Sequence, residues 1–179
     1  MALVVAEVYT NQFLASWQDI ASIRKPIIAA VSGYAVRLSP LSPSFLPSVL
    51  PSLITGLQLG GGCELALMAD ILLAAPNAQF GQPEVNIGTI TGGGGSQRLA
   101  RAVGKSRAME LTLTGHTWSA HDAVAWGMAS RVVDAPTADD DGGVLPVVRE
   151  AIVLAREIAA KSQVAVQAQK EAVNAGASC

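Results

Sequence analysis

Residues 27–31 constrain the fold most, because they read Ile-Ile-Ala-Ala-Val between a Lys-Pro and a Ser-Gly dipeptide. A short apolar run with turn signals on both sides is typical of a strand buried on both faces. Upstream, residues 7–24 carry apolar side chains at spacings of three to five, which predicts a helix. A helix followed by a doubly buried strand predicts an α/β layered fold.

The rest of the chain alternates between short apolar runs and helical patterns. Residues 71–75 predict a second strand, and Ser96 and Ser119 are expected to be the N-caps of two of the helices that follow. The helices are predicted over residues 97–103, 107–114, 120–126, 147–161 and 162–174.

Composition excludes several classes of function. The chain has 12 Lys and Arg against 14 Asp and Glu and no sustained basic run, so we do not expect it to bind nucleic acid. Its two cysteines, Cys63 and Cys179, lie in no C-x-x-C motif or Cys/His cluster. This usage indicates a reducing compartment and no structural zinc.

Residues 36–58 differ from their surroundings. They hold four of the nine prolines and five serines, and they follow neither a helical nor a strand period, so we expect an irregular, disordered segment. The twenty uncharged residues 38–57 could span a bilayer by length, but their prolines argue against a membrane helix. These prolines are Pro40, Pro43, Pro47 and Pro51.

Common catalytic and nucleotide-binding motifs are incomplete in this sequence. The glycine clusters at residues 60–62 and 92–95 do not complete G-x-G-x-x-G. A Walker motif that includes Gly104-Lys105-Ser106 would need glycine where Leu99 stands. The spacing of His116, His121 and Asp122 matches no zinc signature, so we expect these three to be solvated polar residues.

Two carboxylates stand out, since Glu64 and Glu84 each lie beside a glycine- or proline-marked turn in an apolar stretch. Two nearby carboxyl groups in an apolar site can adopt different protonation states, so that one donates a proton while the other accepts one. Residues 60–62 at a helix start could offer an amide to a developing oxyanion. The alternative is that both glutamates are exposed in a helix and a loop.

Several blocks resemble the enoyl-CoA hydratase/isomerase (crotonase) family, and most nearly its short-chain mitochondrial-type hydratases. Residues 25–35 joined directly to residues 59–66 are similar to the family signature. The segments 80–84 (Phe-Gly-Gln-Pro-Glu), 88–99 and 101–115 continue the similarity. The resemblance covers residues 7–174 apart from the proline-rich segment.

The resemblance implies a partial crotonase-like α/β fold of repeated ββα units over residues 1–117, followed by a C-terminal helical region at 118–179. It implies that Glu64 activates a water and that Glu84 gives a proton to Cα. The reaction would be syn addition of water to a trans-2-enoyl-CoA, giving a 3-hydroxyacyl-CoA in fatty-acid β-oxidation. The Gly61 amide would form half of the oxyanion hole, and the pocket would be lined by Gly60, Gly62, Pro83 and Gly92.

The resemblance also implies partners and a compartment. The partner would be an acyl-CoA thioester, and no metal or separate cofactor is expected because CoA is part of the substrate. The family usually forms homo-trimers or hexamers. A mitochondrial location is implied, with any transit peptide lying upstream of this chain, and a cytoplasmic one is the alternative.

The chain departs from the family pattern in three places. It begins at Met1 and ends at Cys179, so we expect it to lack the segment that supplies the second oxyanion amide and the last helices that take part in trimer packing. Residues 36–58 also split the family signature. Two alternatives therefore stay open: another crotonase-family activity, such as isomerisation or thioester hydrolysis, or a catalytically silent fragment.

Two explanations are open for residues 36–58, the segment that splits the family signature. An intron retained in the coding sequence is one, since a valine codon begins with GT, a glutamine codon can end with AG, and 23 codons make 69 in-frame nucleotides. A genuine lid loop over the acyl pocket is the other.

Overall fold

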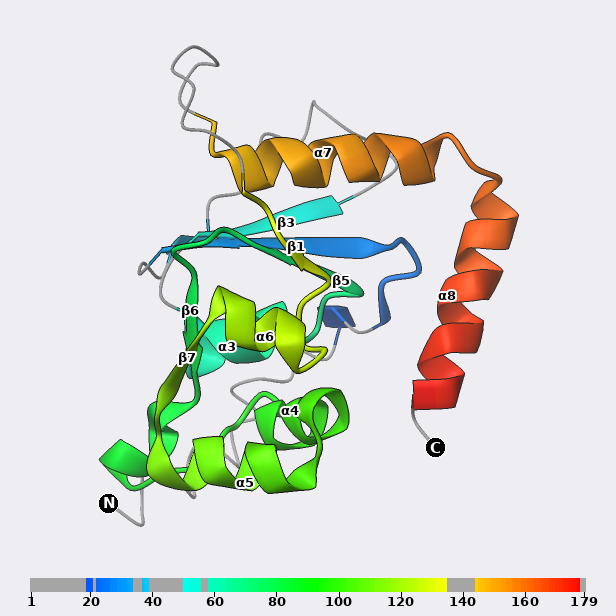
Figure 1. Cartoon of the computed structure of the whole chain (residues 1–179). Coiled ribbons are helices and arrows are strands. Elements are labelled where there is room, and N and C mark those ends of the chain that lie inside the picture. The colour runs from blue at the N-terminus through cyan, green and yellow to red at the C-terminus, as the bar shows by residue number, and fades with distance from the viewer. Residues whose placement is uncertain are drawn as a thin grey trace.

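The computed structural model describes residues 19–20, 22–33, 37–38, 50–55, 58–134 and 144–177. Within these ranges the strands form a five-stranded sheet, ordered β2-β3-β1-β5-β8, and a three-stranded sheet, ordered β4-β6-β7 (Figure 1). Helices lie on both sides of the larger sheet, as the alternation of strands and helices predicted.

The larger sheet is built around β1 (Ile27–Ser32). This strand pairs in parallel with β3 (Leu50–Thr55) on one side and with β5 (Ile71–Ala74) on the other. The short strand β8 (Arg131–Val132) pairs in parallel with β5, and β2 (Arg37–Leu38) pairs antiparallel with β3.

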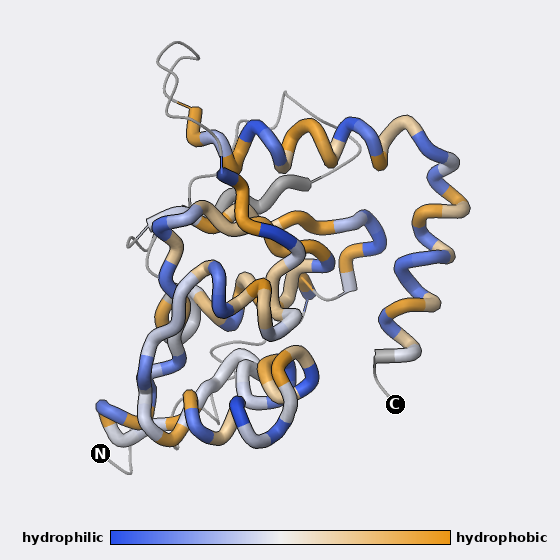
Figure 2. Tube along the Cα trace, viewed as in Figure 1, coloured by the Kyte–Doolittle hydropathy of each residue, from blue (hydrophilic) through white to orange (hydrophobic). Residues whose placement is uncertain are grey.

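Strand β1 is buried on both faces. Ile28 and Ala30 pack with helix α7 (Pro146–Ala159), whereas Ala29 and Val31 belong to the core on the other face. Figure 2 shows apolar colours along β1 and alternating apolar and polar colours along α7, the pattern of a helix with one buried side. The predicted doubly buried strand is therefore confirmed.

The core on this other face of β1 also contains residues of the smaller sheet and of the helices packed against it. The strands are β4 (Gln58–Leu59), β6 (Gln79–Gly81) and β7 (Thr117–Ser119), with β4 parallel and β7 antiparallel to β6. Phe80 of β6 and Trp118 of β7 stack with ring centroids 6.2 Å apart. In this sheet β4 leads into the helix that carries Glu64, and β6 leads into the turn that carries Glu84.

The prediction that residues 36–58 lack ordered structure is wrong for the described part of that segment. Residues 37–38 and 50–55 are strands, and residue 58 begins β4. In the backbone register Pro51 lies opposite Ile28, beside the central strand. Strand formation depends more on a pairing partner than on local propensity, so the sheet neighbour outweighs the proline signal.

Helix boundaries agree with the sequence patterns with one clear exception. Helix α4 (Gly95–Val103) has Gly94 as its N-cap, so the predicted N-cap role of Ser96 is wrong. Ser119 does cap α6 (Ala120–Ala125) and completes a capping box with Asp122, as predicted. Two further helices are α5 (Lys105–Thr114) and α8 (Gln163–Ala177).

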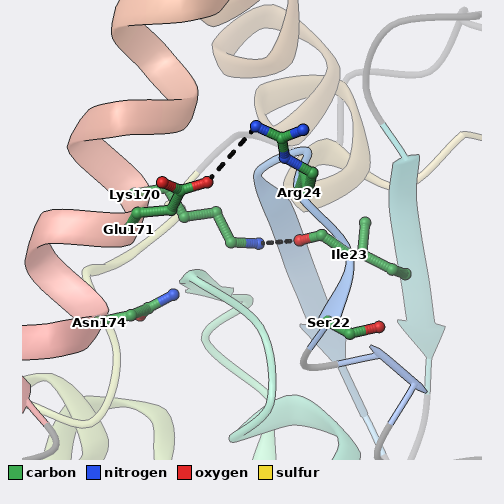
Figure 3. A pocket seen from close by; sticks show the side chains of 6 residues that line it. All are labelled: Ser22, Ile23, Arg24, Lys170, Glu171 and Asn174. Carbon is green, nitrogen blue, oxygen red and sulfur yellow. Dashed lines mark hydrogen bonds and ion pairs between the residues drawn. The ribbon is translucent and has the colours of Figure 1, made fainter.

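The predicted helix at residues 7–24 falls mostly outside the described residues. Of the residues in this range that the structure describes, residues 19, 20 and 22 are helical. A pocket lies between residues 22–24 and α8, and Lys170 crosses it to the Ile23 carbonyl (Figure 3). In the described part of the chain, no helix has the length and apolar character needed to cross a membrane.

Candidate active site

Glu64 lies in the short helix α3 (Gly61–Ala66) and is 2 % exposed. The helix begins after Gly60, whose φ of 57° favours glycine. The Gly60 N–H donates to the Gly81 carbonyl at 2.8 Å, which ties the start of α3 to strand β6. The glycine cluster and the smaller sheet together fix where Glu64 points.

The carboxylate of Glu64 is held by backbone amides of the second glycine cluster. Its Oε1 atom accepts hydrogen bonds from Gly93 N at 2.8 Å and from Gly95 N at 2.7 Å. Two amide donors compensate for taking a carboxylate out of water and fix its orientation.

The loop that supplies these amides is itself braced. Arg98 Nη1 donates to the Gly93 carbonyl at 2.6 Å, and Gly94 adopts a φ of 88°. A Cβ on Gly95 would lie 2.8 Å from Glu64 Oε1, too close for a real side chain. Glycine at position 95 therefore allows the backbone to approach the carboxylate.

Glu84 comes to the same region from the 3₁₀ helix η1 (Pro83–Ile87), which begins with Pro83. Its Oε1 atom lies 2.9 Å from where a Cβ on Gly60 would stand, so this carboxyl packs over the start of α3. Its Oε2 atom is buried and has no hydrogen-bond partner among the residues that the structure describes.

The two carboxyl groups have different environments. Burial raises the pKa of Glu84 above its ordinary value, and the nearby charge of Glu64 raises it further. Glu64 instead has two amide donors on one oxygen. Two carboxyl groups in different environments are an arrangement that paired acid and base chemistry can use.

The first glycine cluster lies where the sequence placed it, at a helix start. Gly61 and Gly62 are the first two residues of α3, where N–H groups have no acceptor inside the helix. Gly92 is exposed next to the two amides that hold Glu64. The structure thus gathers both predicted glutamates and the glycines of both clusters in one region.

Other polar candidates have structural roles. Asp122 forms the capping box with Ser119, whose hydrogen bonds lower the pKa of the Asp122 carboxyl. Cys63 is buried, and burial raises the pKa of its thiol. Within the described ranges, no group of three or more His, Cys, Asp or Glu side chains is placed to hold a metal ion.

Sequence reasoning missed three residues of this region. Gly93 and Gly95 supply the amides for Glu64, where the sequence pointed to Gly92. Gln82 is 1 % exposed, although it lies between the two turns that carry the glutamates. The sequence carries no signal for its burial, because the polar residues Gln79 and Glu84 lie in the same short stretch.

Comparisons with known proteins identify a family that the chain matches. The family described as enoyl-CoA hydratase/isomerase matches residues 44–179. A probable mitochondrial enoyl-CoA hydratase of Dictyostelium discoideum is 45 % identical over 173 residues, covering 97 % of this chain and 51 % of the relative. The mitochondrial enoyl-CoA hydratase of Pongo abelii is 43 % identical over 167 residues, covering 93 % and 47 %.

A solved structure shows the same arrangement of elements. An enoyl-CoA hydratase subunit I from Geobacillus kaustophilus superposes with a TM-score of 0.73 at 33 % identity, covering 98 % of this chain and 55 % of that one. The chain spans about half the length of the curated relatives it matches. By sequence and by its crotonase-like α/β fold, the chain belongs to the enoyl-CoA hydratase/isomerase family.

Proposed function

We propose that this chain carries the catalytic carboxyl pair of an enoyl-CoA hydratase, which adds water to a trans-2-enoyl-CoA in fatty-acid β-oxidation. The observation that carries the proposal is the convergence of Glu64 and Glu84 in contrasting environments. The names of the matched relatives support the same reaction.

In this proposal Glu64 is the general base. Its carboxylate accepts a proton from water as the water oxygen forms a bond to C3 of the substrate. The two amide donors from Gly93 and Gly95 keep the carboxylate oriented for that transfer. The π electrons of the C2–C3 double bond move toward C2 and the thioester carbonyl.

Glu84 is the general acid. It gives its proton to C2, which completes the single bond between C2 and C3. Its raised pKa favours the protonated form that this step requires. The proton gained by Glu64 and the one lost by Glu84 balance, and exchange with solvent or between the carboxyls restores the starting state.

The thioester oxygen collects negative charge during this addition, so it needs a hydrogen-bond donor. The Gly61 N–H, at the first position of α3, is the proposed donor. Gly60, Gly62, Pro83 and Gly92 surround the carboxyl pair in sequence and are proposed to line the pocket.

The remaining expectations rest on the family. The substrate is proposed to be an acyl-CoA thioester, with no separate cofactor because the thioester itself stabilises the charge. A mitochondrial location is proposed, since two of the matched relatives are named as mitochondrial. Homo-trimer or hexamer formation stays a prediction of the resemblance.

The test is hydration of a short trans-2-enoyl-CoA by the purified 179-residue chain, followed by loss of the conjugated thioester absorbance. Glu64→Gln and Glu84→Gln should each lower kcat/KM by about 100-fold or more, because each removes one proton-transfer group. Glu110→Gln, at an exposed position of α5, is the matched control and should keep the unsubstituted rate.

Absence of turnover in the unsubstituted chain would contradict the proposed activity. Hydration that persists in Glu64→Gln would instead favour another crotonase-family reaction, since isomerisation or hydrolysis does not need the same pair of groups.

A further inference from the structure

Gln82 is a buried polar side chain that the carboxyl pair leaves unexplained. It is 1 % exposed, and its Nε2 and Oε1 atoms have no hydrogen-bond partner in the described part of the chain. Gln82 stands at the N-cap position of η1, but its side chain does not cap that helix. Burying a carboxamide without partners costs free energy, so such a residue calls for an explanation.

The position of its amide nitrogen supplies one. A Cβ built on Gly95 would lie 2.3 Å from Gln82 Nε2 and 2.8 Å from Glu64 Oε1, so both atoms flank the same point. That carboxylate oxygen already accepts two backbone N–H groups. The Gln82 N–H group therefore lies beside the proposed base, and no acceptor for it is found within the described ranges.

We propose that Gln82 is a further catalytic residue, which donates a hydrogen bond from Nε2 to the oxygen of the water that Glu64 activates. The proposal rests on the proposed hydratase function. A water molecule has two O–H groups and two lone pairs. One O–H goes to Glu64, one lone pair accepts from Gln82, and the second lone pair attacks C3.

The same contacts extend to the product. After addition, the water oxygen is the 3-hydroxyl oxygen of the 3-hydroxyacyl-CoA. That hydroxyl can still donate to Glu64 and accept from Gln82 Nε2. A saturated acyl-CoA has no oxygen at this position, so it makes neither contact.

The chemistry of the side chain suits this role. A carboxamide does not titrate, so it can hold the water without competing with Glu64 or Glu84 for protons. Glycine at position 95 leaves room for it, since a Cβ there would displace the amide nitrogen. Gln82 thus contributes orientation while the two carboxyls move the protons.

The test compares the affinity of two ligands by calorimetry, butyryl-CoA and 3-hydroxybutyryl-CoA. Titrations use a Glu84→Gln background, which stops conversion of the hydroxyacyl ligand. Gln82→Met keeps the length of the side chain and removes its donor. Adding this substitution should weaken the binding of 3-hydroxybutyryl-CoA about 10-fold and leave the affinity for butyryl-CoA unchanged. In the chain with Glu84 intact, Gln82→Met should lower kcat about 10-fold or more with little change in KM.

Gln79→Met is the matched control, because it makes the same substitution three residues earlier on β6 at a partly exposed position. It should change neither ligand's affinity. Gln82→Asn keeps a carboxamide on a shorter side chain, so it should weaken the binding of 3-hydroxybutyryl-CoA less than Gln82→Met does.

An unchanged ratio of the two affinities in Gln82→Met would overturn the proposal for Gln82 alone, and so would equal weakening of both ligands. Failure of the Glu84→Gln background to bind butyryl-CoA would overturn the proposed function together with the role of Gln82. Unchanged butyryl-CoA binding also shows that the Met variant has kept its folded site.

Discussion

Glu64 is buried with two backbone donors on one carboxylate oxygen. Glu84 has one oxygen over Gly60, and its other oxygen has no hydrogen-bond partner among the residues described in the structure. The sequence could identify both residues, because charged side chains beside glycine turns in apolar stretches are uncommon without a function. It could not identify Gln82, since the burial of that side chain depends on how the loop before α4 folds against β6.

The raised pKa of Glu84 predicts a pH-dependent effect on stability. A group whose pKa is higher in the folded than in the unfolded chain stabilises the fold below its unfolded pKa, and this contribution is lost as the pH rises through the folded value. Glu84→Gln, which stays neutral, should therefore unfold at higher urea concentration than the unsubstituted chain at pH 7. Because Glu84 is partly solvated, the gain should be less than about 1 kcal/mol.

Below pH 4 the gain should disappear, because glutamate is then protonated in both states. Glu110→Gln, at an exposed site, should show no such dependence. Destabilisation by Glu84→Gln at pH 7, or an equal effect at both pH values, would contradict the assigned environment.

Gly95→Ala tests the close approach of the backbone to Glu64. Its Cβ would lie 2.3 Å from Gln82 Nε2 and 2.8 Å from Glu64 Oε1, so the loop or both side chains must move. We expect a loss of about 1–3 kcal/mol in the free energy of unfolding together with loss of hydration activity. Gly176→Ala meets nothing within 4 Å and serves as the control. An active, fully stable Gly95→Ala chain would show that the loop is not constrained in this way.

At the scale of elements, local signals succeed where a helix end is set by its own residues. The capping box at Ser119 and Asp122 could be read from the sequence, because both partners lie within one turn. The N-cap of α4 could not be read from the sequence. The helix begins at Gly95, whose N–H donates to Glu64, a residue of α3 that lies far away in sequence. Strand β3 was missed for the same reason, since its pairing partner β1 lies far away in sequence.

Ser119→Ala should destabilise the chain by about 1 kcal/mol, because it removes the side-chain acceptor for Asp122 N and the donor to Asp122 Oδ2. The lowered pKa of Asp122 contributes stability above its unfolded pKa, and that contribution is lost as the pH falls through the folded value. The difference between the two chains in urea unfolding should therefore shrink toward pH 3.

Ser106→Ala, at an exposed position in the first turn of α5, is the control for this substitution and should be nearly neutral. A difference at Ser119 that grows as the pH falls would contradict the capping-box assignment.

Helix α8 is joined to the body of the molecule through Lys170. The Lys170 Nζ atom donates to the carbonyls of Ile23 and Lys25 at 2.8 and 2.9 Å and to Asp70 Oδ2 at 2.7 Å. Lys170→Met removes all three bonds, which should cost about 1–3 kcal/mol. Hydrogen exchange in α8 should become faster, while Lys161→Met, at an exposed position, should leave it unchanged. Unaltered protection of α8 in Lys170→Met would show that other contacts hold this helix.

For the whole molecule, the layered α/β arrangement follows from a few sequence features. The sequence predicted that β1 is buried on both faces and that the helix at α7 is amphipathic, and the structure shows that these two elements pack together. The order of the strands could not be predicted, because the parallel pairing of β1 with β3 and β5 depends on connections of many residues. It is this pairing, with the smaller sheet, that brings Glu64 and Glu84 to one place.

The central claim is that these two carboxyls divide the chemistry, with Glu84 moving the proton at C2 and Glu64 acting on water. Exchange of the C2 hydrogens of butyryl-CoA in deuterium oxide isolates the first step, because this ligand has no double bond to hydrate. NMR of the ligand should show exchange with the unsubstituted chain and with Glu64→Gln, and none above background with Glu84→Gln. Exchange that persists in Glu84→Gln and is lost in Glu64→Gln would contradict the assignment.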